Sequence, residues 1–229
     1  MMKVFAHRGY DAKDNTLEAF QNAVEKKFDY LEADIHRTGD YDLVLHHDPI
    51  IGTHHIEKTP VDILTETYPD LLTLDGFFLH FPPTVYKSYL DLKGSDSVST
   101  LVMNYLNQKG IPLCNIIVAS FNRYHLNTFI HNKIPVKLGF ITANTYLPHE
   151  LDTMIYGVDF IVVDWTSLSN RLMEIVLQHN KKIIVYTCKT IPEYQYIKRF
   201  NHGSTNTLYG IVSDIIIPYE NNINPTTLI

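Results

Sequence analysis

Short apolar runs recur along the whole chain, separated by polar, turn-rich or helical stretches. Most runs are rich in β-branched or aromatic side chains, which is typical of strands buried on both faces. We therefore expect strands over residues 3–6, 30–35, 43–45, 89–92, 115–119, 137–141, 159–163, 182–186 and 210–212.

Several of the intervening stretches have the apolar spacing of an amphipathic helix. Residues 16–24, 97–108 and 168–178 each place apolar side chains on one helical face. Strands that alternate with helices at this interval indicate a parallel sheet. Eight such units close naturally into a (β/α)₈ barrel, and an open doubly wound sheet is the alternative.

The interval after the second strand is longer than the others. Residues 38–42 are turn-rich and leave no room for a helix, so residues 30–37 and 43–48 are predicted to form a β-hairpin. If this hairpin centres near residue 40, Asp34 faces about residue 47, and His47 then lies beside the acidic residues of the preceding strand.

Residues 49–84 contain five prolines and are expected to form an irregular insertion at the barrel mouth, with one short helix near residues 74–81. The chain has no repeats, low-complexity tracts or linker. We expect residues 1–229 to form one domain that carries this short insertion.

Composition narrows the class of protein. Hydrophobic residues make up 45% and charged residues 19% of the 229 residues, which excludes wholesale disorder. The net charge of −6 leaves no basic surface, so nucleic acid is not an expected partner. No apolar run approaches a membrane span, and the residues before His7 are too few for a signal peptide. We expect a cytoplasmic protein without stable membrane insertion; its oligomeric state stays open.

Polar side chains gather where the predicted strands end. They are His7 and Arg8, Glu32 and Asp34, His47, and Asp91 and Lys93. In a (β/α)₈ barrel the carboxyl ends of the strands hold the catalytic groups. Residues 32 and 34 alternate along one strand, so both side chains point to the same face.

These residue types form a consistent chemical set. Three carboxylates are the oxygen ligands that Mg²⁺ or Ca²⁺ prefers, and the two imidazoles can act as acid and base near neutral pH. Arg8 and Lys93 suit the oxygens of a phosphate. Together they favour a site for phosphoryl transfer, where charge stabilisation supplies most of the catalysis.

The same residues carry a resemblance to the glycerophosphodiester phosphodiesterase family, which runs from residue 4 to about 217. The specific part is the first 48 residues, with the motifs His7-Arg8-Gly9, Asp14-Asn15-Thr16, Glu32-x-Asp34, Thr38 and His47-Asp48. Later and shorter matches are Asp91-Leu92-Lys93, Ser120-Phe121, Tyr186-Thr187 and Gly210-Ile211-Val212-Ser213-Asp214.

The resemblance implies a (β/α)₈ barrel of the phospholipase C-like phosphodiesterase type. It implies metal-dependent hydrolysis of glycerophosphodiesters to sn-glycerol 3-phosphate and an alcohol, within phospholipid and glycerol metabolism. By position, the implied roles are acid and base for His7 and His47, phosphate binding for Arg8 and Lys93, and binding of Mg²⁺ or Ca²⁺ for Glu32, Asp34 and Asp91.

The sequence departs from the family pattern at three places. Asp14 and Asp91 stand where the family has Glu, and each is one methylene shorter, which leaves the choice and affinity of the metal open. Tyr186 replaces a Trp in the wall beside the alcohol, where it and Phe121 are candidate substrate contacts. Asp14 is expected instead to cap the helix that starts near Thr16.

Other interpretations remain at this stage. The same site can serve lysophospholipids or teichoic-acid-like polymers, for which Phe77-Phe78-Leu79 is a candidate apolar lip, or the barrel can bind without cutting. A zinc site from His46, His47, His54 and His55 is disfavoured, because adjacent residues of a strand face opposite ways. Cys114 and Cys188 are expected to be buried, inert thiols.

Overall fold

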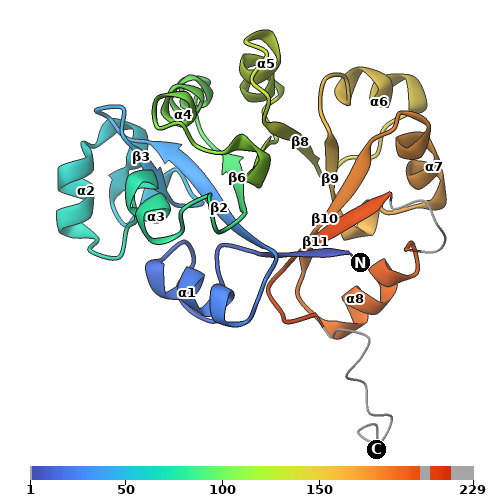
Figure 1. Ribbon diagram of the computed structural model, residues 1–229, viewed down its shortest axis with the longest axis horizontal. Helices are drawn as coiled ribbons and strands as arrows, with labels where there is room; N and C mark the ends of the chain where they lie inside the picture. The colour runs from blue at the N-terminus through green and yellow to red at the C-terminus, as the bar shows by residue number, and fades with distance from the viewer. Residues whose placement is uncertain (1, 202–206, 218–229) are drawn as a thin grey trace, which may run out of the picture.

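Eight parallel strands close into a barrel in the computed structural model, which describes residues 2–201 and 207–217 (Figure 1). The order is β1-β11-β10-β9-β8-β7-β6-β2, and β1 also pairs with β2, which closes the ring. This closure confirms the predicted (β/α)₈ barrel and excludes an open sheet. The strands are β1 (Lys3–Ala6), β2 (Tyr30–Arg37), β6 (Ser88–Leu92), β7 (Ile116–Ser120), β8 (Lys137–Thr142), β9 (Phe160–Asp164), β10 (Lys182–Cys188) and β11 (Leu208–Ser213).

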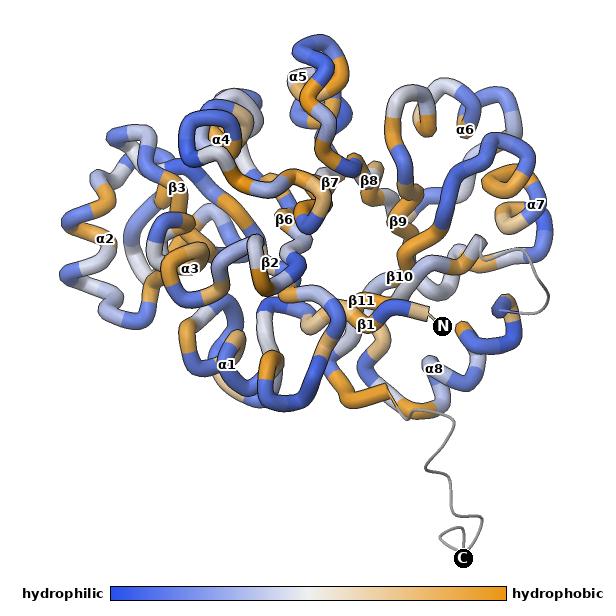
Figure 2. Tube along the Cα trace, in the orientation of Figure 1, coloured by the Kyte–Doolittle hydropathy of each residue, from blue (hydrophilic) through white to orange (hydrophobic). Residues whose placement is uncertain are grey.

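Helices surround the strands and turn their apolar faces inward (Figures 1 and 2). The predicted helices over residues 16–24, 97–108 and 168–178 are α1, α4 and α7. Side-chain caps start several of them; Thr16, for example, accepts a hydrogen bond from the amide of Ala19. The outer helices are α1 (Leu17–Glu25), α4 (Ser97–Gln108), α5 (Arg123–His131), α6 (Pro148–Met154), α7 (Asn170–Gln178) and α8 (Ile191–Lys198).

A β-hairpin follows β2, as the sequence predicts. Strand β3 (Leu43–Leu45) runs antiparallel to β2 with Ile35 opposite Leu45. The amide of His46 then donates to the carbonyl of Asp34 at 3.1 Å, so the chain reaches His47 beside the end of β2. The predicted pairing near residue 47 is thus one position from the observed register.

The insertion is more regular than the sequence suggested. The predicted helix is α3 (Leu74–His80), but the segment also forms β4 (Ile50–Ile51), β5 (His54–His55), a 3₁₀ turn at Ile56–Lys58, and α2 (Val61–Thr67). A small apolar cluster with Ile56 and Leu64 at its centre holds these pieces together. Pro60, which suggested a break, instead occupies the position before the first turn of α2.

Large side chains fill the barrel interior near the amino-terminal ends of the strands. Phe5 stacks on Tyr30, and the Tyr30 and Tyr209 hydroxyls lie 2.8 Å apart near the amino-terminal ends of the strands. These rings leave the carboxyl ends as the open end of the barrel, where the predicted site lies.

Two expectations about surface residues are wrong. Phe77 and Phe78 are buried against the core, because α3 turns them toward α1 and α4, so only Leu79 of the predicted lip is exposed. Cys188 is buried, but Cys114 is exposed in the turn before β7. Within residues 2–201 and 207–217, every helix is too short or too polar to cross a membrane.

Candidate active site

A cavity of about 230 Å³ lies at the carboxyl ends of the barrel strands. It collects every site residue that the sequence predicts, although they come from separate strands and loops. The predicted residues in its lining are His7, Arg8, Glu32, Asp34, His47, Asp91 and Lys93; Phe121 and Tyr186 also line it.

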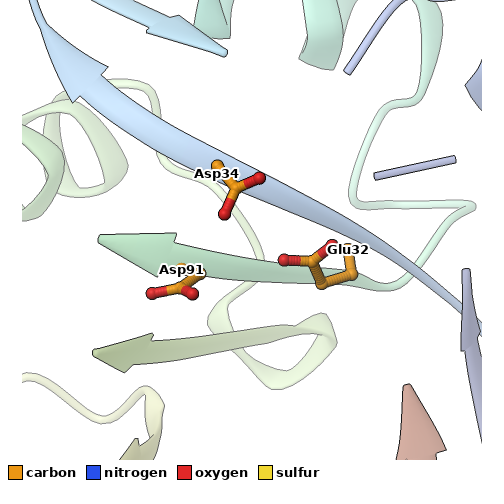
Figure 3. A group of neighbouring side chains, drawn as sticks. All are labelled: Glu32, Asp34 and Asp91. Atoms are coloured by element: carbon orange, nitrogen blue, oxygen red, sulfur yellow. The ribbon is translucent and has the colours of Figure 1, made fainter. Parts of the chain in front are cut away.

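Three carboxylates form the acidic side of the cavity (Figure 3). Glu32 and Asp34 alternate on β2 and share its inner face, and Asp91 of β6 lies directly opposite Asp34 in the strand register. One ligand oxygen from each residue lies within 4.8 Å of the others, and all three residues are buried.

Two cations face these carboxylates. The Nζ of Lys93 lies 2.6 Å from Asp91 and 3.1 Å from Asp34. The backbone amide of Arg8 donates to Glu32 at 2.7 Å, and its Nε lies 3.1 Å from Asp34 as an ion pair that is not aligned as a hydrogen bond. The cluster is therefore only partly neutralised by the protein's own cations.

The pKa values of the carboxyl groups reflect this imbalance. Burial, reinforced by Asp34 and Asp91, raises the pKa of Glu32 well above its usual value. Burial also raises the pKa of Asp91 to about 7, although Lys93 opposes it. The pKa of Asp34 is lowered, because Lys93, Arg8 and a hydrogen bond from Asn15 together outweigh its burial.

The donor set fits a hard divalent cation. Among the described residues, Oδ1 of Asp91 is buried without a hydrogen-bond partner, which is costly unless a ligand satisfies it. A cation bound by Glu32, Asp34 and Asp91 would supply that partner and offset the burial and mutual repulsion that raise the pKa values of Glu32 and Asp91.

His7 and His47 each pair with a carboxylate. Nδ1 of His7 lies 2.6 Å from Asp214, which follows β11, and Nδ1 of His47 lies 2.7 Å from Asp48. An ionised carboxylate only accepts hydrogen bonds, so Nδ1 carries the hydrogen in each ring. The Nε2 atom of each imidazole is then the one available for proton transfer.

Some residues of the sequence motifs make contacts that position the site residues, a role that the sequence alone does not indicate. Asn15 is buried and both donates to the Asp34 carboxylate at 3.0 Å and accepts from the Asp34 amide at 3.2 Å. The expectation for Asp14 is wrong: Thr16 caps α1, and Asp14 instead forms an exposed ion pair with Arg8 at 3.1 Å. Of the two carboxylate–imidazole pairs, only His47 with Asp48 is adjacent in the sequence and could have been predicted from it.

Solved structures of similar fold span nearly the whole chain. One glycerophosphodiester phosphodiesterase, from Parabacteroides distasonis, is 20% identical, with a TM-score of 0.77 over 93% of this chain and 92% of the other. One from Thermotoga maritima is also 20% identical, with a TM-score of 0.77 over 93% and 95%. A phosphodiesterase from Oleispira antarctica, solved with its product sn-glycerol-3-phosphate, is 19% identical, with a TM-score of 0.77 over 93% and 92%.

At these identities the structural likeness establishes the fold alone, and no curated protein sequence matches the chain. The family itself is established by sequence. The family described as "Glycerophosphoryl diester phosphodiesterase family" matches residues 7–199, which include all seven predicted site residues. The chain therefore belongs to the glycerophosphoryl diester phosphodiesterase family and is a phosphoric diester hydrolase.

Proposed function

We propose that this protein hydrolyses glycerophosphodiesters to sn-glycerol 3-phosphate and an alcohol, with a divalent metal, in phospholipid and glycerol metabolism. The observation that carries the proposal is one cavity lined by two carboxylate-supported imidazoles, the cations Arg8 and Lys93, and three buried carboxylates. The product bound to the Oleispira antarctica phosphodiesterase supports the identity of the phosphate product.

The cations bind the phosphate, and the imidazoles transfer protons. Arg8 and Lys93 bind the non-bridging phosphate oxygens and stabilise the charge that develops on them. Either water attacks phosphorus directly, or the glycerol 2-hydroxyl attacks first and water then opens the cyclic phosphodiester that this forms. In each attack, one imidazole of the pair His7 and His47 accepts the proton of the nucleophile. The other imidazole protonates the departing alkoxide. The carboxylates of Asp214 and Asp48 stabilise whichever ring is charged at each stage.

Glu32, Asp34 and Asp91 would hold the metal, either Mg²⁺ or Ca²⁺, since both accept an all-oxygen ligand set. When bound, such an ion neutralises phosphate charge and helps to orient the diester. The protein supports this set by fixing Glu32 through the Arg8 amide and Asp34 through Asn15.

Phe121 and Tyr186 form the wall against which the alcohol is proposed to pack. Their rings lie edge to face with centroids 6.0 Å apart, and Phe121 is 51% exposed. The burial of Phe77 and Phe78 removes the feature that favoured lysophospholipids. We further propose that residues 1–229 act as one catalytic domain in the cytoplasm, without a nucleic acid partner.

The test measures release of glycerol 3-phosphate from glycerophosphocholine and glycerophosphoethanolamine, with Mg²⁺, Ca²⁺ or Mn²⁺ added and with a chelator. We expect release that the chelator abolishes. His7→Ala and His47→Ala should each lose activity while keeping the wild-type melting temperature. His179→Ala is the matched control, because His179 also pairs with a carboxylate, that of Asp152 at 2.8 Å, but outside the cavity.

Each unfavourable outcome has a distinct meaning. Activity that survives the chelator would remove the metal from the proposal. A His7 or His47 variant with wild-type turnover would remove that residue from the chemistry. Release from lysophospholipids or polymers alone would keep the reaction and change the substrate, whereas binding without release from any diester would favour a binding barrel.

A further inference from the structure

His36 is a buried histidine that does not line the cavity but touches the backbone of a residue that does. It lies on β2 two positions after Asp34 and is 2% exposed. Its Nε2 lies 3.2 Å from the backbone carbonyl of His47. A carbonyl only accepts hydrogen bonds, so Nε2 is the donor, and burial lowers the pKa of His36, which keeps the ring neutral.

The other edge of this imidazole faces the segment that follows Lys93. Gly94 has a φ of +76°, and a Cβ placed on it would lie 3.1 Å from Nδ1 of His36 and 2.2 Å from Oε1 of Glu57. Nδ1 has no hydrogen-bond partner among the described residues, so this edge makes only packing contacts. The ring is thus wedged between the His47 loop and the backbone after Lys93.

Glu57 from the insertion closes the same arrangement. Its Oε1 accepts from the amide of Ser95 at 2.7 Å, and its Oε2 pairs with Arg37 at 3.5 Å. The segment that carries Lys93 is therefore fixed from the insertion side, and His36 contacts it from β2. The imidazole therefore packs against a segment that a hydrogen bond to Glu57 holds in place.

The His47 loop depends on few attachments. It begins after β3 ends at Leu45, and the side chains of His47 and Asp48 are 42% and 69% exposed. Two hydrogen bonds tie the loop to β2: His46 N–H to the carbonyl of Asp34, and His36 Nε2–H to the carbonyl of His47. The second acts on the residue that carries the reacting imidazole.

We propose that His36 is a positioning residue for His47, which holds the His47 imidazole at its working place relative to Lys93 and the carboxylates. The proposal rests on the proposed function, in which His47 transfers a proton. A displacement of about 1 Å in a reacting group can cost about a hundredfold in rate, so one such anchor has a measurable effect on turnover.

The experiment measures kcat and KM for glycerophosphodiester hydrolysis in His36→Leu, His36→Gln, His47→Ala and the double variant His36→Leu/His47→Ala. We expect His36→Leu to lower kcat by about tenfold to a hundredfold with little change in KM. The amide nitrogen of the Gln variant can donate to the same carbonyl and should restore most of the turnover. His47→Ala should keep only the residual turnover that the remaining site groups support, and on this background His36→Leu should lower the residual kcat no further.

Tyr30→Phe is the matched control, because it removes a partly buried hydrogen bond at the amino-terminal end of the same strand. Its small effect on kcat should be the same with and without His47. If His36→Leu does not fold, His36→Asn replaces it, since its shorter amide does not reach the carbonyl.

Two results would overturn the positioning role while the proposed function stands. One is an inactive His47→Ala together with normal turnover in His36→Leu. The other is a His36→Leu effect of equal size on both backgrounds, which would mean a general structural role. Wild-type turnover in His47→Ala would instead overturn the assignment of His47, and the role of His36 with it.

Discussion

Protons and a divalent cation should compete for the three buried carboxylates, and the competition should be visible in protein stability. The pKa of Asp91 is about 7 in the folded protein, against 3.8 for an ordinary Asp. Because the folded protein holds the Asp91 proton more tightly than the unfolded chain, the stability from this group is fully present below pH 3.8 and is lost as the pH rises through about 7. Glu32, whose pKa is also raised, acts in the same direction.

The difference between the pKa of Asp91 in the unfolded chain, 3.8, and in the folded protein, about 7, corresponds to about 4 kcal/mol of unfolding free energy. About half of this, or about 2 kcal/mol, is lost between pH 5.5 and pH 8. For a protein of this size, that equals a fall in melting temperature of about 4–8 °C. Asp34 does not titrate in this range, because its pKa is lowered and its contribution is lost only under acid conditions.

The assay is thermal unfolding of the metal-free wild type and of Asp91→Asn at pH 5.5 and pH 8, each repeated with Mg²⁺ and with Ca²⁺. The variant should lose less stability with rising pH than the wild type. Metal should stabilise the wild type more at pH 8, because bound protons oppose metal binding at the lower pH. Asp159→Asn is the control. Asp159 lies just before the amino-terminal end of β9, at the end of the barrel away from the site, so the variant should keep the wild-type pH dependence of stability.

Parallel stability curves for the wild type and Asp91→Asn would refute the raised pKa of Asp91. An equal stabilisation by metal at both pH values would refute the competition. The first result would mean that Arg8 and Lys93 already neutralise the carboxylates, and the second that the metal binds elsewhere.

Three further perturbations test the support of the site. Asp214→Ala should lower kcat by about tenfold to a hundredfold without unfolding the protein, because the imidazole of His7 loses the carboxylate that orients it; steady-state kinetics measures this. Asn15→Ala breaks two hydrogen bonds with Asp34 and should cost about 1–3 kcal/mol by chemical denaturation. Gly9→Ala should lower the melting temperature strongly, since φ is +96° and the new Cβ would lie 2.7 Å from the backbone of α1.

The barrel and its site could be predicted because both follow from local pattern. A parallel strand buried on both faces is apolar along its length, so polar residues within it or just after it stand out. His7, Glu32, Asp34 and Asp91 are all recognisable in this way, and the alternation of β2 places two of them on one face. Closure of the barrel then brings them together without any further information in the sequence.

The parts that could not be predicted depend on tertiary contacts. Phe77 and Phe78 are consecutive aromatics that a surface lip or a core can equally use, and only the placement of α3 decides that they are buried. Asp214 meets His7 across 207 residues of sequence through the pairing of β1 with β11. Helix α2 of the insertion forms because its apolar residues pack into a small separate cluster, which no local pattern indicates.

The shortened side chain at Asp91 is accommodated by the strand register. Asp91 lies opposite Asp34, and its oxygen stays within 4.8 Å of those of Glu32 and Asp34 despite the missing methylene. The missing methylene therefore does not open the cluster, and its three carboxylates remain an all-oxygen set that either Ca²⁺ or Mg²⁺ accepts. The departure from Glu leaves the reaction class intact.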